Sequence, residues 1–293
     1  MGEMTLPRLS LGGASAAAAG RLRHAGLETP ELDARLLLCH AAGLSHEAYV
    51  ALLETELIAE AAKRFGAAIE RRLQGEPVSR ILGVREFYGR VFAIDAATLD
   101  PRPDTETLVE AALAIIEQRG VREAPLKLLD LGTGSGCILL TLLAELPAAS
   151  GVGIDVSAAA LACAKANAER LGVERRASFV ASDWLQAVTG RFDLIVANPP
   201  YLAASEIAGL AREVSGYEPR AALDGGIDGL QAYRRLVPRA RENLRRGGTL
   251  LLEVGREQAG AVVEILAAAG LRMEGKTLWR DLGGRARVVA ASA

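Results

Sequence analysis

The sequence predicts an α/β protein with a mostly parallel, helix-covered sheet, preceded by a smaller helical domain. Three observations support this fold class. From about residue 126 onward, short apolar runs typical of strands alternate with amphipathic helical patterns. One of these runs leads directly into a glycine-rich turn, as in the nucleotide-binding sheets of this class. The first 74 residues, in contrast, have apolar residues mostly at helical spacing.

The N-terminal segment contains several helix signals. Thr29 and Pro30 form a helix start, in which a capping residue is followed by proline at the first helical position. Leu32, Leu36 and Cys39 fall at i, i+4 and i+7, and Leu37 and Leu38 widen the apolar face that this spacing predicts. Ser45 is expected to cap the next helix, and a third helical pattern covers residues 57–73. A small helical bundle is the simplest structure for this segment.

The residues that follow differ in character. Glu76-Pro77 breaks the preceding helix, and residues 86–94 are rich in aromatic and β-branched side chains, which favours a hairpin or extended linker. Residues 101–104 then precede an amphipathic helix that ends at Gly120. The predicted parts are a helical domain at 1–74, a hairpin linker at 75–100 and a larger domain at 101–293.

The larger domain contains the alternating elements. Strands are predicted at residues 126–131, 151–154, 177–181, 192–197, 249–254, 271–278 and 286–291. Helices are predicted at residues 137–146, 157–172, 230–244 and 256–269. Pro238 lies inside the third of these helices, where it removes a backbone hydrogen bond, so we expect a kink or interruption there.

Composition limits the functional classes. The chain has 293 residues, a net charge of −2 and a pI near 6.0. This charge argues against a protein that functions bound to nucleic acid, which usually has a strong basic excess. Its three cysteines and three histidines lack metal-ligand spacing, and the sparse, odd cysteine count fits a reducing cytosol. Neither a membrane-spanning apolar stretch nor a secretory signal is expected. We therefore predict a cytoplasmic protein without a bound metal.

The predicted strand 192–197 ends in Asn198-Pro199-Pro200-Tyr201. Proline fixes φ near about −65° and donates no backbone hydrogen bond, and the residue before a proline is pushed toward an extended conformation. The loop therefore presents two stiff acceptors, the Asn198 side-chain oxygen and the Pro199 carbonyl, with Tyr201 as a flat wall. It suits a planar –NH2 group, whose nitrogen is a poor nucleophile until acceptors hold its protons. The alternative is a proline-rich turn that only closes the strand.

A glycine-rich turn follows the predicted strand 126–131. Its pattern is G-x-G-x-G, which allows a tight turn and close approach of the backbone to a nucleotide-like ligand. No G-K-[ST] follows, which argues against a P-loop. Asp155 ends the next strand, about 20 positions beyond the glycines, where a carboxylate is placed to accept ribose hydroxyls. Taken singly, the turn can be purely structural, and Asp155 can be a helix-start residue.

These three motifs share one position in the fold. Each ends a strand, and open α/β sheets bind ligands at the carboxyl ends of their strands. Together they predict a Rossmann-like methyltransferase that uses S-adenosylmethionine.

Longer motifs then point to one family. They are PRPDTE (101–106), LDLGTGSG (129–136), NPPY (198–201) and EPRAALDGGIDGL (218–230), and GVREFYG (83–89) looks like the family's hairpin. Their order resembles the HemK/PrmC family, the protein-glutamine N5-methyltransferases that modify peptide chain release factors. The resemblance covers nearly the whole chain and is weakest in the helical segment. NPPY alone is shared with adenine-N6 and other amine methyltransferases.

The resemblance implies roles for individual residues. The implied cofactor-binding residues are Gly132, Thr133, Gly134, Ser135, Gly136, Asp155, Trp184 and Asn198. The glycine turn would follow the methionine and ribose parts of the cofactor, Asp155 would take the ribose hydroxyls, and Trp184 would pack near the adenine. The implied substrate-binding residues are Asn198, Pro199, Pro200 and Tyr201, of which Asn198 and Pro199 are the catalytic pair that holds the glutamine amide. Core packing is the alternative for Trp184.

Three residues near the PRPDTE motif are less clear. Arg102 and Glu106 match the family's loop, where a salt-bridged helix start and a role in the site both stay open. Asp100 departs from the family, which usually has an aliphatic residue before this motif.

The implied reaction moves a methyl group from S-adenosylmethionine to a glutamine side-chain amide in a release factor, in translation termination. We expect a cytoplasmic monomer that binds neither nucleic acid nor membrane, with the helical segment recognising the folded release factor. A nucleic-acid adenine-N6 methyltransferase is the alternative enzyme, but it needs a basic groove. A catalytically inert adaptor is the other alternative, and it has no need of the NPPY loop.

Overall fold

The chain forms two compact units, which the computed structural model describes over residues 9–293. The first unit ends at Gly83, and the second comprises Val84–Ala293. This boundary divides the predicted linker 75–100. Its beginning belongs to the helical unit, whereas its hairpin belongs to the larger unit.

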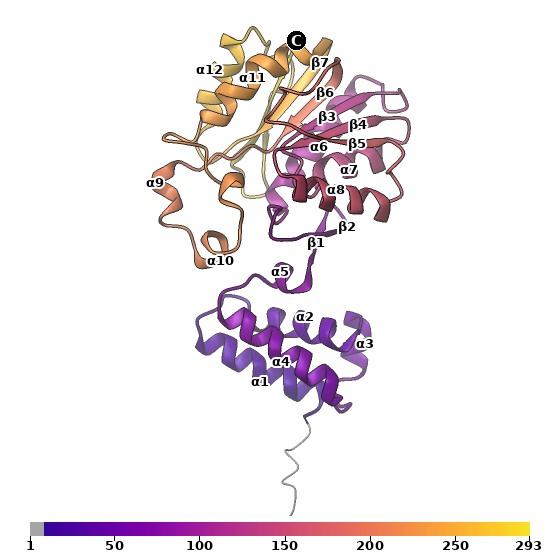
Figure 1. Cartoon of the computed structure of the whole chain (residues 1–293), viewed down its shortest axis with the longest axis vertical. Coiled ribbons are helices and arrows are strands. Elements are labelled where there is room, and N and C mark those ends of the chain that lie inside the picture. The colour runs from indigo at the N-terminus through magenta and orange to yellow at the C-terminus, as the bar shows by residue number, and fades with distance from the viewer. Residues whose placement is uncertain (1–8) are drawn as a thin grey trace, which may run out of the picture. The chain divides into compact units, whose positions relative to one another are not determined.

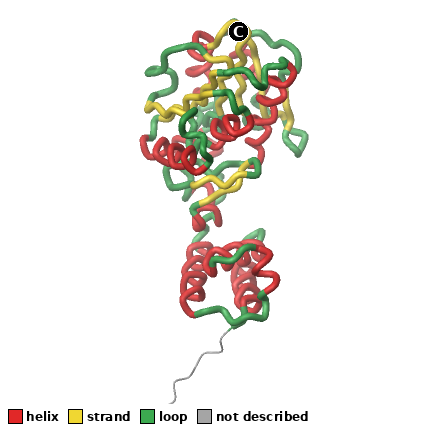
Figure 2. The backbone as a smooth tube through the Cα atoms, turned by 90° about the vertical axis from the view of Figure 1, so that its right-hand side faces the viewer, coloured by secondary structure: helices red, strands yellow, loops and turns green. Residues whose placement is uncertain are grey.

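The first unit consists of helices joined by loops (Figure 2). They are α1 (Leu11–His24), α2 (Pro30–Ala42), α3 (His46–Ala51), α4 (Ala59–Leu73) and α5 (Val78–Leu82). Pro30 begins α2 as predicted, and the Ser45 hydroxyl caps α3 by accepting a hydrogen bond from the Ala48 N–H.

The predicted apolar face of α2 is right only in part. Leu37 and Leu38 are fully buried in the core and Cys39 packs against it, whereas Leu32 and Leu36 are 42% and 40% exposed. The buried residues Ala34, Leu37, Leu38 and Ala41 also recur at i, i+3, i+4 and i+7, so α2 has two apolar faces of helical spacing. A polar contact accompanies the buried face. Arg72 of α4 donates to Asp33 of α2 at 2.6 Å, and both side chains are 6% exposed.

The second unit is built on a seven-stranded sheet (Figure 1). In spatial order its strands are β5 (Ala177–Ala181), β4 (Ser150–Asp155), β3 (Lys127–Leu131), β6 (Phe192–Ala197), β7 (Leu244–Glu253), β9 (Ala286–Ser292) and β8 (Leu278–Arg280). The first five strands are parallel, and β9 is antiparallel to both of its neighbours. The parallel-rich sheet confirms the predicted fold class.

Helices cover both faces of this sheet. One face packs against α6 (Glu106–Gln118), α7 (Cys137–Glu145) and α8 (Ala158–Arg170), and the other against α11 (Gln231–Asn243) and α12 (Ala259–Ala268). Successive side chains of a strand point to opposite faces. Accordingly, Leu128 joins the core under α6 and α7, whereas Leu129 joins the core under α11 and α12.

The predicted hairpin consists of β1 (Val84–Phe87) and β2 (Arg90–Ala93). The Tyr88 N–H, in its turn, donates to Glu106 at the start of α6, at 2.8 Å. The Ala93 N–H donates to Asn167 of α8 at 2.8 Å, and the amide nitrogen of Asn167 donates to the Ser135 carbonyl at 2.9 Å. The hairpin is thereby tied to the segment that carries the glycine turn.

One element prediction is wrong, and another is wrong in part. A strand at 271–278 does not form, because Gly275 has a φ of 70°, and only Leu278–Arg280 is extended as β8. The helix α11 runs through Pro238 without the predicted interruption, and the alternative, a kink, stays a prediction. Its neighbours Leu236 and Val237 are fully buried, so packing against the sheet outweighs the lost hydrogen bond. Between β6 and α11 the chain also forms α9 (Ala204–Ile207), α10 (Arg212–Ser215) and the short turn η2 (Arg220–Ala222).

Within residues 9–293, no helix combines the length and apolar character needed to cross a membrane. In that same range, histidine, cysteine and acidic side chains do not gather in threes as a metal site.

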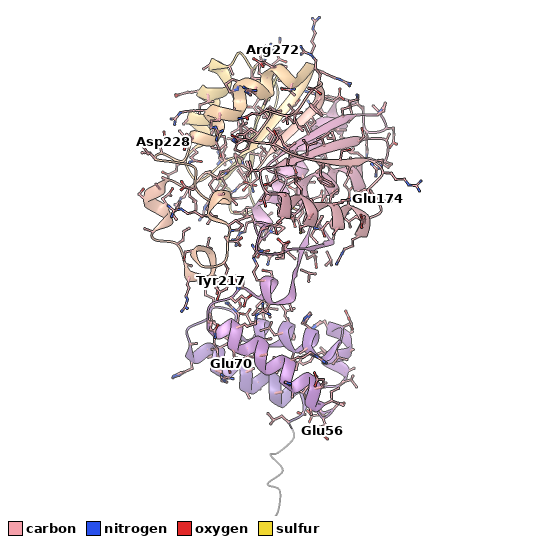
Figure 3. The ribbon with its side chains drawn as sticks, viewed as in Figure 1. Glu56, Glu70, Glu174, Tyr217, Asp228 and Arg272 are labelled. Carbon is pink, nitrogen blue, oxygen red and sulfur yellow. The ribbon has the colours of Figure 1, made fainter. Side chains whose placement is uncertain are left out.

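Replacing Arg72 with Ala should destabilise the helical unit by about 3–5 kcal/mol, because Asp33 would stay buried without its cation. Amide hydrogen exchange measures this, and protection should fall in both α2 and α4. The control is Arg21→Ala, which removes an exposed pair with Glu70, a residue labelled in Figure 3, and should cost less than about 1 kcal/mol. Equal protection in both variants would contradict the importance of the buried pair.

Candidate active site

Three neighbouring strands end at one edge of the sheet and carry the predicted motifs. Leu131, at the end of β3, lies opposite Ile154 of β4 on one side and Ala197 of β6 on the other. The glycine turn therefore begins between Asp155 and Asn198, the residues that close the flanking strands. The strand order also reverses at β3, which makes this edge a topological switch point of the kind that binds ligands.

The glycine turn folds back on β4. The N–H groups of Gly132 and Thr133 both donate to the Ile154 carbonyl, at 2.9 and 2.8 Å. Gly134 has a φ of 54°, which an L side chain rarely adopts. The Thr133 hydroxyl donates to Asp130 at 2.7 Å, so a buried carboxylate beneath the turn holds it in place.

Asp155 connects this turn to α8. Its Oδ2 accepts from the Gly134 N–H at 3.0 Å, and its Oδ1 accepts from the Ser157 N–H at 2.9 Å. The helix-start alternative is therefore present in the structure. Each carboxylate oxygen can accept more than one hydrogen bond, so these contacts leave room for ribose hydroxyls. The ribose role stays a prediction.

The Asn198 side chain is oriented by the PRPDTE segment. Its Nδ2 donates to the Oγ1 of Thr105, in the short turn η1 (Pro103–Thr105), at 3.1 Å. With its nitrogen engaged there, the amide of Asn198 keeps its oxygen as a separate acceptor, which is the atom the predicted role requires.

The segment 218–230 packs against the NPPY loop. The Gly225 N–H donates to the Leu202 carbonyl at 2.9 Å. A Cβ at Gly225 would lie 2.8 Å from the Pro200 carbonyl oxygen, and one at Gly229 would collide with the Tyr201 carbonyl. Because these glycines lack a side chain, the backbone of the segment 218–230 lies closer to the backbone of the NPPY loop than a larger residue would allow.

Glu218 resolves two of the open questions around PRPDTE. Its side chain is 1% exposed and accepts from Arg102 at 3.0 Å and from the Asp100 N–H at 3.1 Å. Arg102 is thus part of an ion pair and also lines the site. The Asp100 carboxylate lies 3.7 Å from Arg85 of the hairpin, so a cation balances the charge where the family usually has an aliphatic residue.

Two cavities open at this edge. The first, of about 380 Å³, is lined by seven of the predicted cofactor residues, namely Gly132, Thr133, Gly134, Ser135, Asp155, Trp184 and Asn198, together with Pro200. The second, of about 390 Å³, is lined by Asn198 and Tyr201 with residues such as Asp104, Glu253 and Arg287. Gly136 and Pro199 line neither cavity. Trp184 is half-buried and also packs against the core, so its predicted alternative applies in part.

Burial dominates the electrostatics of the site. Burial raises the pKa of Asp130 and of Glu253 to about 7 each. Hydrogen bonding from Thr133 lowers the pKa of Asp130, and hydrogen bonding from Thr105 lowers that of Glu253, but both effects are smaller than that of burial. Burial, followed by the charge of Glu253, raises the pKa of Tyr201 to about 12. At neutral pH the Tyr201 phenol is therefore protonated, and it cannot act as a base.

Several residues of the site escaped the sequence analysis. They are Thr105, Glu218, Glu253, Gln258 and Arg287. Gln258 illustrates the pattern, because its Nε2 donates to the Tyr201 carbonyl at 2.8 Å while its Oε1 accepts from the Gly255 N–H at 3.1 Å. One signal was visible: Glu253 is an ionisable residue that directly follows the apolar run Leu250–Leu252.

The chain is similar to known proteins. A family model described as the PrmC N-terminal domain matches residues 14–83, and one described as a methyltransferase small domain matches residues 110–214. A release factor glutamine methyltransferase of Bradyrhizobium diazoefficiens is 48% identical, over 93% of this chain and 91% of its own. One of Rhodospirillum rubrum is 49% identical, over 93% of this chain and 82% of its own. The chain belongs to the release factor glutamine methyltransferase family.

A solved structure confirms the fold of this family member. The hMettl16 catalytic domain in complex with the MAT2A 3'UTR hairpin 6 aligns with a TM-score of 0.55, covering 80% of this chain and 81% of that chain. The two sequences are only 17% identical, so the likeness concerns the methyltransferase fold alone.

The cofactor of this methyltransferase is S-adenosylmethionine, and the first cavity fits it. Its volume of about 380 Å³ lies within the range of small-molecule sites, roughly 300–1,000 Å³. The glycine turn offers backbone without side chains, Asp155 offers a carboxylate for hydroxyl groups, and Trp184 offers a flat apolar surface. These residues would hold the cofactor.

Asp155→Ala should weaken S-adenosylmethionine binding. A hydrogen bond to a charged acceptor contributes about 1.5–3 kcal/mol, which is roughly one to two decades in Kd. Titration calorimetry measures the change. Because Asp155 also accepts from the Ser157 N–H at the start of α8, the thermal stability of the variant is measured alongside. Unchanged affinity in Asp155→Ala would restrict this residue to a structural role.

Proposed function

We propose that this chain transfers the methyl group of S-adenosylmethionine to the side-chain amide nitrogen of a glutamine in a peptide chain release factor. The observation that carries the proposal is the position of Asn198, which lines both cavities. A methyl donor in the first cavity and an amide in the second would meet beside this side chain. The relatives named release factor glutamine methyltransferase support the choice of substrate.

The protein's task in this reaction is alignment. When bound, S-adenosylmethionine supplies a methyl group attached to a sulfonium centre. The neutral thioether that remains is a good leaving group, so no general acid is required. Holding a nucleophile in line contributes up to about 7–11 kcal/mol. Asn198 Oδ1 and the Pro199 carbonyl accept the two amide protons, which favours a less conjugated and more nucleophilic nitrogen. One of these protons is lost after transfer.

The surroundings of the loop fit such a mechanism. Thr105 holds the Asn198 amide by its nitrogen, and Gln258 holds the Tyr201 carbonyl. The acceptors are thus oriented before the substrate arrives. The three histidines, His24, His40 and His46, all lie outside the motifs of the site in the sequence, which supports a mechanism without a strong base.

The helical unit recognises the folded release factor in this proposal. A glutamine side chain offers too few atoms for tight binding, so affinity requires a second surface. On α2, Leu32 and Leu36 lie one turn apart and are 42% and 40% exposed. Such a pair of apolar side chains is suited to a protein partner.

The proposal also places the reaction in the cytoplasm, where translation occurs, and the chain acts as a monomer on protein without binding nucleic acid or membrane. The net charge of −2 supports the exclusion of nucleic acid. The role is a step in translation termination.

The direct test is incubation with labelled S-adenosylmethionine and, separately, release factor, duplex DNA and tRNA. Mass mapping of the product should find one added methyl group on a glutamine side chain of the release factor. Label in DNA or tRNA instead would overturn the proposed substrate.

Asn198→Ala should reduce kcat by roughly 10²–10³, the usual loss for one preorganised contact, because an acceptor for the amide protons disappears. Single-turnover kinetics with release factor measure the chemical step. Calorimetry should show S-adenosylmethionine affinity close to that of the unaltered chain, because the glycine turn is retained. Near-normal turnover would contradict the assigned role.

Changing Leu32 and Leu36 together to Ser should raise the KM for intact release factor while kcat stays nearly constant. A short glutamine-containing peptide should be a poor substrate of both proteins and should not distinguish them. The control is Val50→Ser on α3, which alters an apolar residue that is even more exposed, at 53%, and lies outside this pair. An unchanged KM would mean that the release factor binds elsewhere.

A further inference from the structure

A third cavity lies at the opposite edge of the sheet from the candidate active site. It has a volume of about 300 Å³ and opens where β3, β4, β5 and β6 begin. Its lining includes Lys127 of β3, Ser150 of β4, Ser178 of β5 and Arg191, which precedes β6. Because these four strands are parallel, this amino-edge cavity lies away from the motifs that follow their carboxyl ends. It shares no lining residue with either cavity of the active site.

The amino-edge cavity is strongly cationic. Lys127, Arg175, Arg176 and Arg191 line it, and none of its lining residues is acidic. Within residues 9–293, none of these four side chains forms an ion pair with a carboxylate. The whole chain has a net charge of −2, so this local excess does not reflect its average composition. Like charges that gather without a counter-charge repel one another, and a bound anion would remove that cost.

Two of the four cations are held in place by neutral groups. The Arg176 guanidinium donates to the backbone carbonyls of Leu143, Leu146 and Ala149, at 2.7, 3.0 and 2.9 Å. The Arg191 guanidinium donates to the first carbonyl of β7 at 3.0 Å. A carbonyl carries no net charge, so these hydrogen bonds fix the position of each guanidinium without cancelling its charge. The cavity therefore contains positive charge that is already oriented before a ligand binds.

The acidic residues near this edge do not neutralise the cavity. Asp193 of β6 accepts from the Lys127 backbone N–H at 2.7 Å, but its carboxylate pairs with Arg245 at 2.8 Å. Glu174, which is labelled in Figure 3, precedes Arg175 in the sequence, yet it is exposed and does not line the cavity.

Hydroxyl groups lie beside the cations. Lys127 is opposite Ser150 in the pairing of β3 with β4, and Val152 is opposite Ser178 in the pairing of β4 with β5. Side chains two residues apart on a strand share a face, so Lys127, Ser150 and Ser178 point to the same side of the sheet. Thr189 lines the cavity as well. The three hydroxyls form no hydrogen bond with any residue of the described range 9–293, so each can donate to an oxyanion.

We propose that the amino-edge cavity binds a small molecule that carries one or more phosphate groups. Arginine guanidinium groups bind phosphate oxygens in a fork-like geometry, and a lysine ammonium adds a point charge. A single carboxylate offers only one negative charge to the four cations, whereas a pyrophosphate group offers at least two. Phosphate oxygens also accept hydrogen bonds from hydroxyls, which the cavity supplies.

A nucleic-acid strand fits this cavity less well. Its charges are spread along a backbone, whereas the four cations line a single cavity of about 300 Å³. That volume is at the lower end of the range of small-molecule sites, roughly 300–1,000 Å³. A compact ligand brings its charge to all four side chains at once.

The test is calorimetric titration of the full chain with inorganic pyrophosphate, at an ionic strength kept constant with sodium chloride because salt screens exposed charges. The unaltered chain should bind one pyrophosphate in a saturable manner. The double variant Lys127→Gln, Arg175→Gln should bind it more weakly, by up to about fivefold for each exposed cation that is removed. Arg176 is not altered, because it also holds three backbone carbonyls.

The control is the double variant Lys165→Gln, Arg239→Gln, which removes the same two charges from exposed positions on α8 and α11 outside the cavity. It should keep the pyrophosphate affinity of the unaltered chain. Both double variants should bind S-adenosylmethionine normally, because the cofactor residues lie at the other edge of the sheet. Absence of saturable pyrophosphate binding, or an equal loss of affinity in the control, would overturn the proposed site.

Thermal unfolding in a phosphate-free buffer separates binding from folding. Because the variant Lys127→Gln, Arg175→Gln relieves repulsion, its Tm should equal or exceed that of the unaltered chain. A lower Tm would show that these cations stabilise the fold by themselves, which contradicts the proposal.

Two further probes identify the source of the phosphate. Tighter binding of adenosine diphosphate than of pyrophosphate would support a nucleotide as the ligand, and equal binding would support recognition of the phosphate groups alone. A mixed-sequence RNA oligomer should not compete with pyrophosphate. If the oligomer binds and pyrophosphate does not, the cavity is a nucleic-acid contact and the proposed small-molecule site is wrong.

Discussion

The parallel pairing of β3 with β4 and β6 is the constraint on which the site depends. Because the three strands run in the same direction, the turn after β3, the carboxylate after β4 and the proline loop after β6 emerge at one edge. A slip of one residue in either register would exchange the two faces of a strand. Leu128 and Leu129, which pack into different cores, would then change places. The two apolar cores therefore hold the chemistry in register.

That edge also concentrates buried acidic groups. Asp130, Glu218 and Glu253 are all less than 9% exposed, and each contacts a loop of the site instead of solvent. Burial costs a carboxylate more than it costs an apolar side chain of similar size. Asp130 and Glu218 offset part of that cost by accepting hydrogen bonds, Asp130 from the Thr133 hydroxyl and Glu218 from Arg102 and the Asp100 N–H. These buried carboxylates lower the stability of the fold, but they fix the geometry of the loops where the two cavities meet.

The sequence was most informative where a motif determines its own conformation. Glycines with positive φ and consecutive prolines act locally, so the turn at Gly132–Gly136 and the loop at Asn198–Tyr201 were recognisable without knowledge of the fold. Thr105, Glu218 and Gln258 were not, because their partners lie 93, 116 and 57 residues away in the chain. Spacing was ambiguous for α2, where two apolar faces have helical spacing and the one beside the buried Asp33–Arg72 pair enters the core. At Pro238, packing against the sheet outweighed the tendency of proline to interrupt a helix.

In the proposed mechanism, the supports of the NPPY loop explain why its acceptors need no strong base nearby. Gly225 and Gly229 let one segment lie directly against the loop, Gln258 holds its tyrosine carbonyl, and Thr105 holds its asparagine. Each contact fixes an acceptor before any ligand binds, so little reorientation is required during the reaction. A weak nucleophile such as an amide benefits from that arrangement more than an amine does, since its electrons are released only when both protons are held in place. The distant residues around the loop are therefore as much a part of its chemistry as the four residues of the motif.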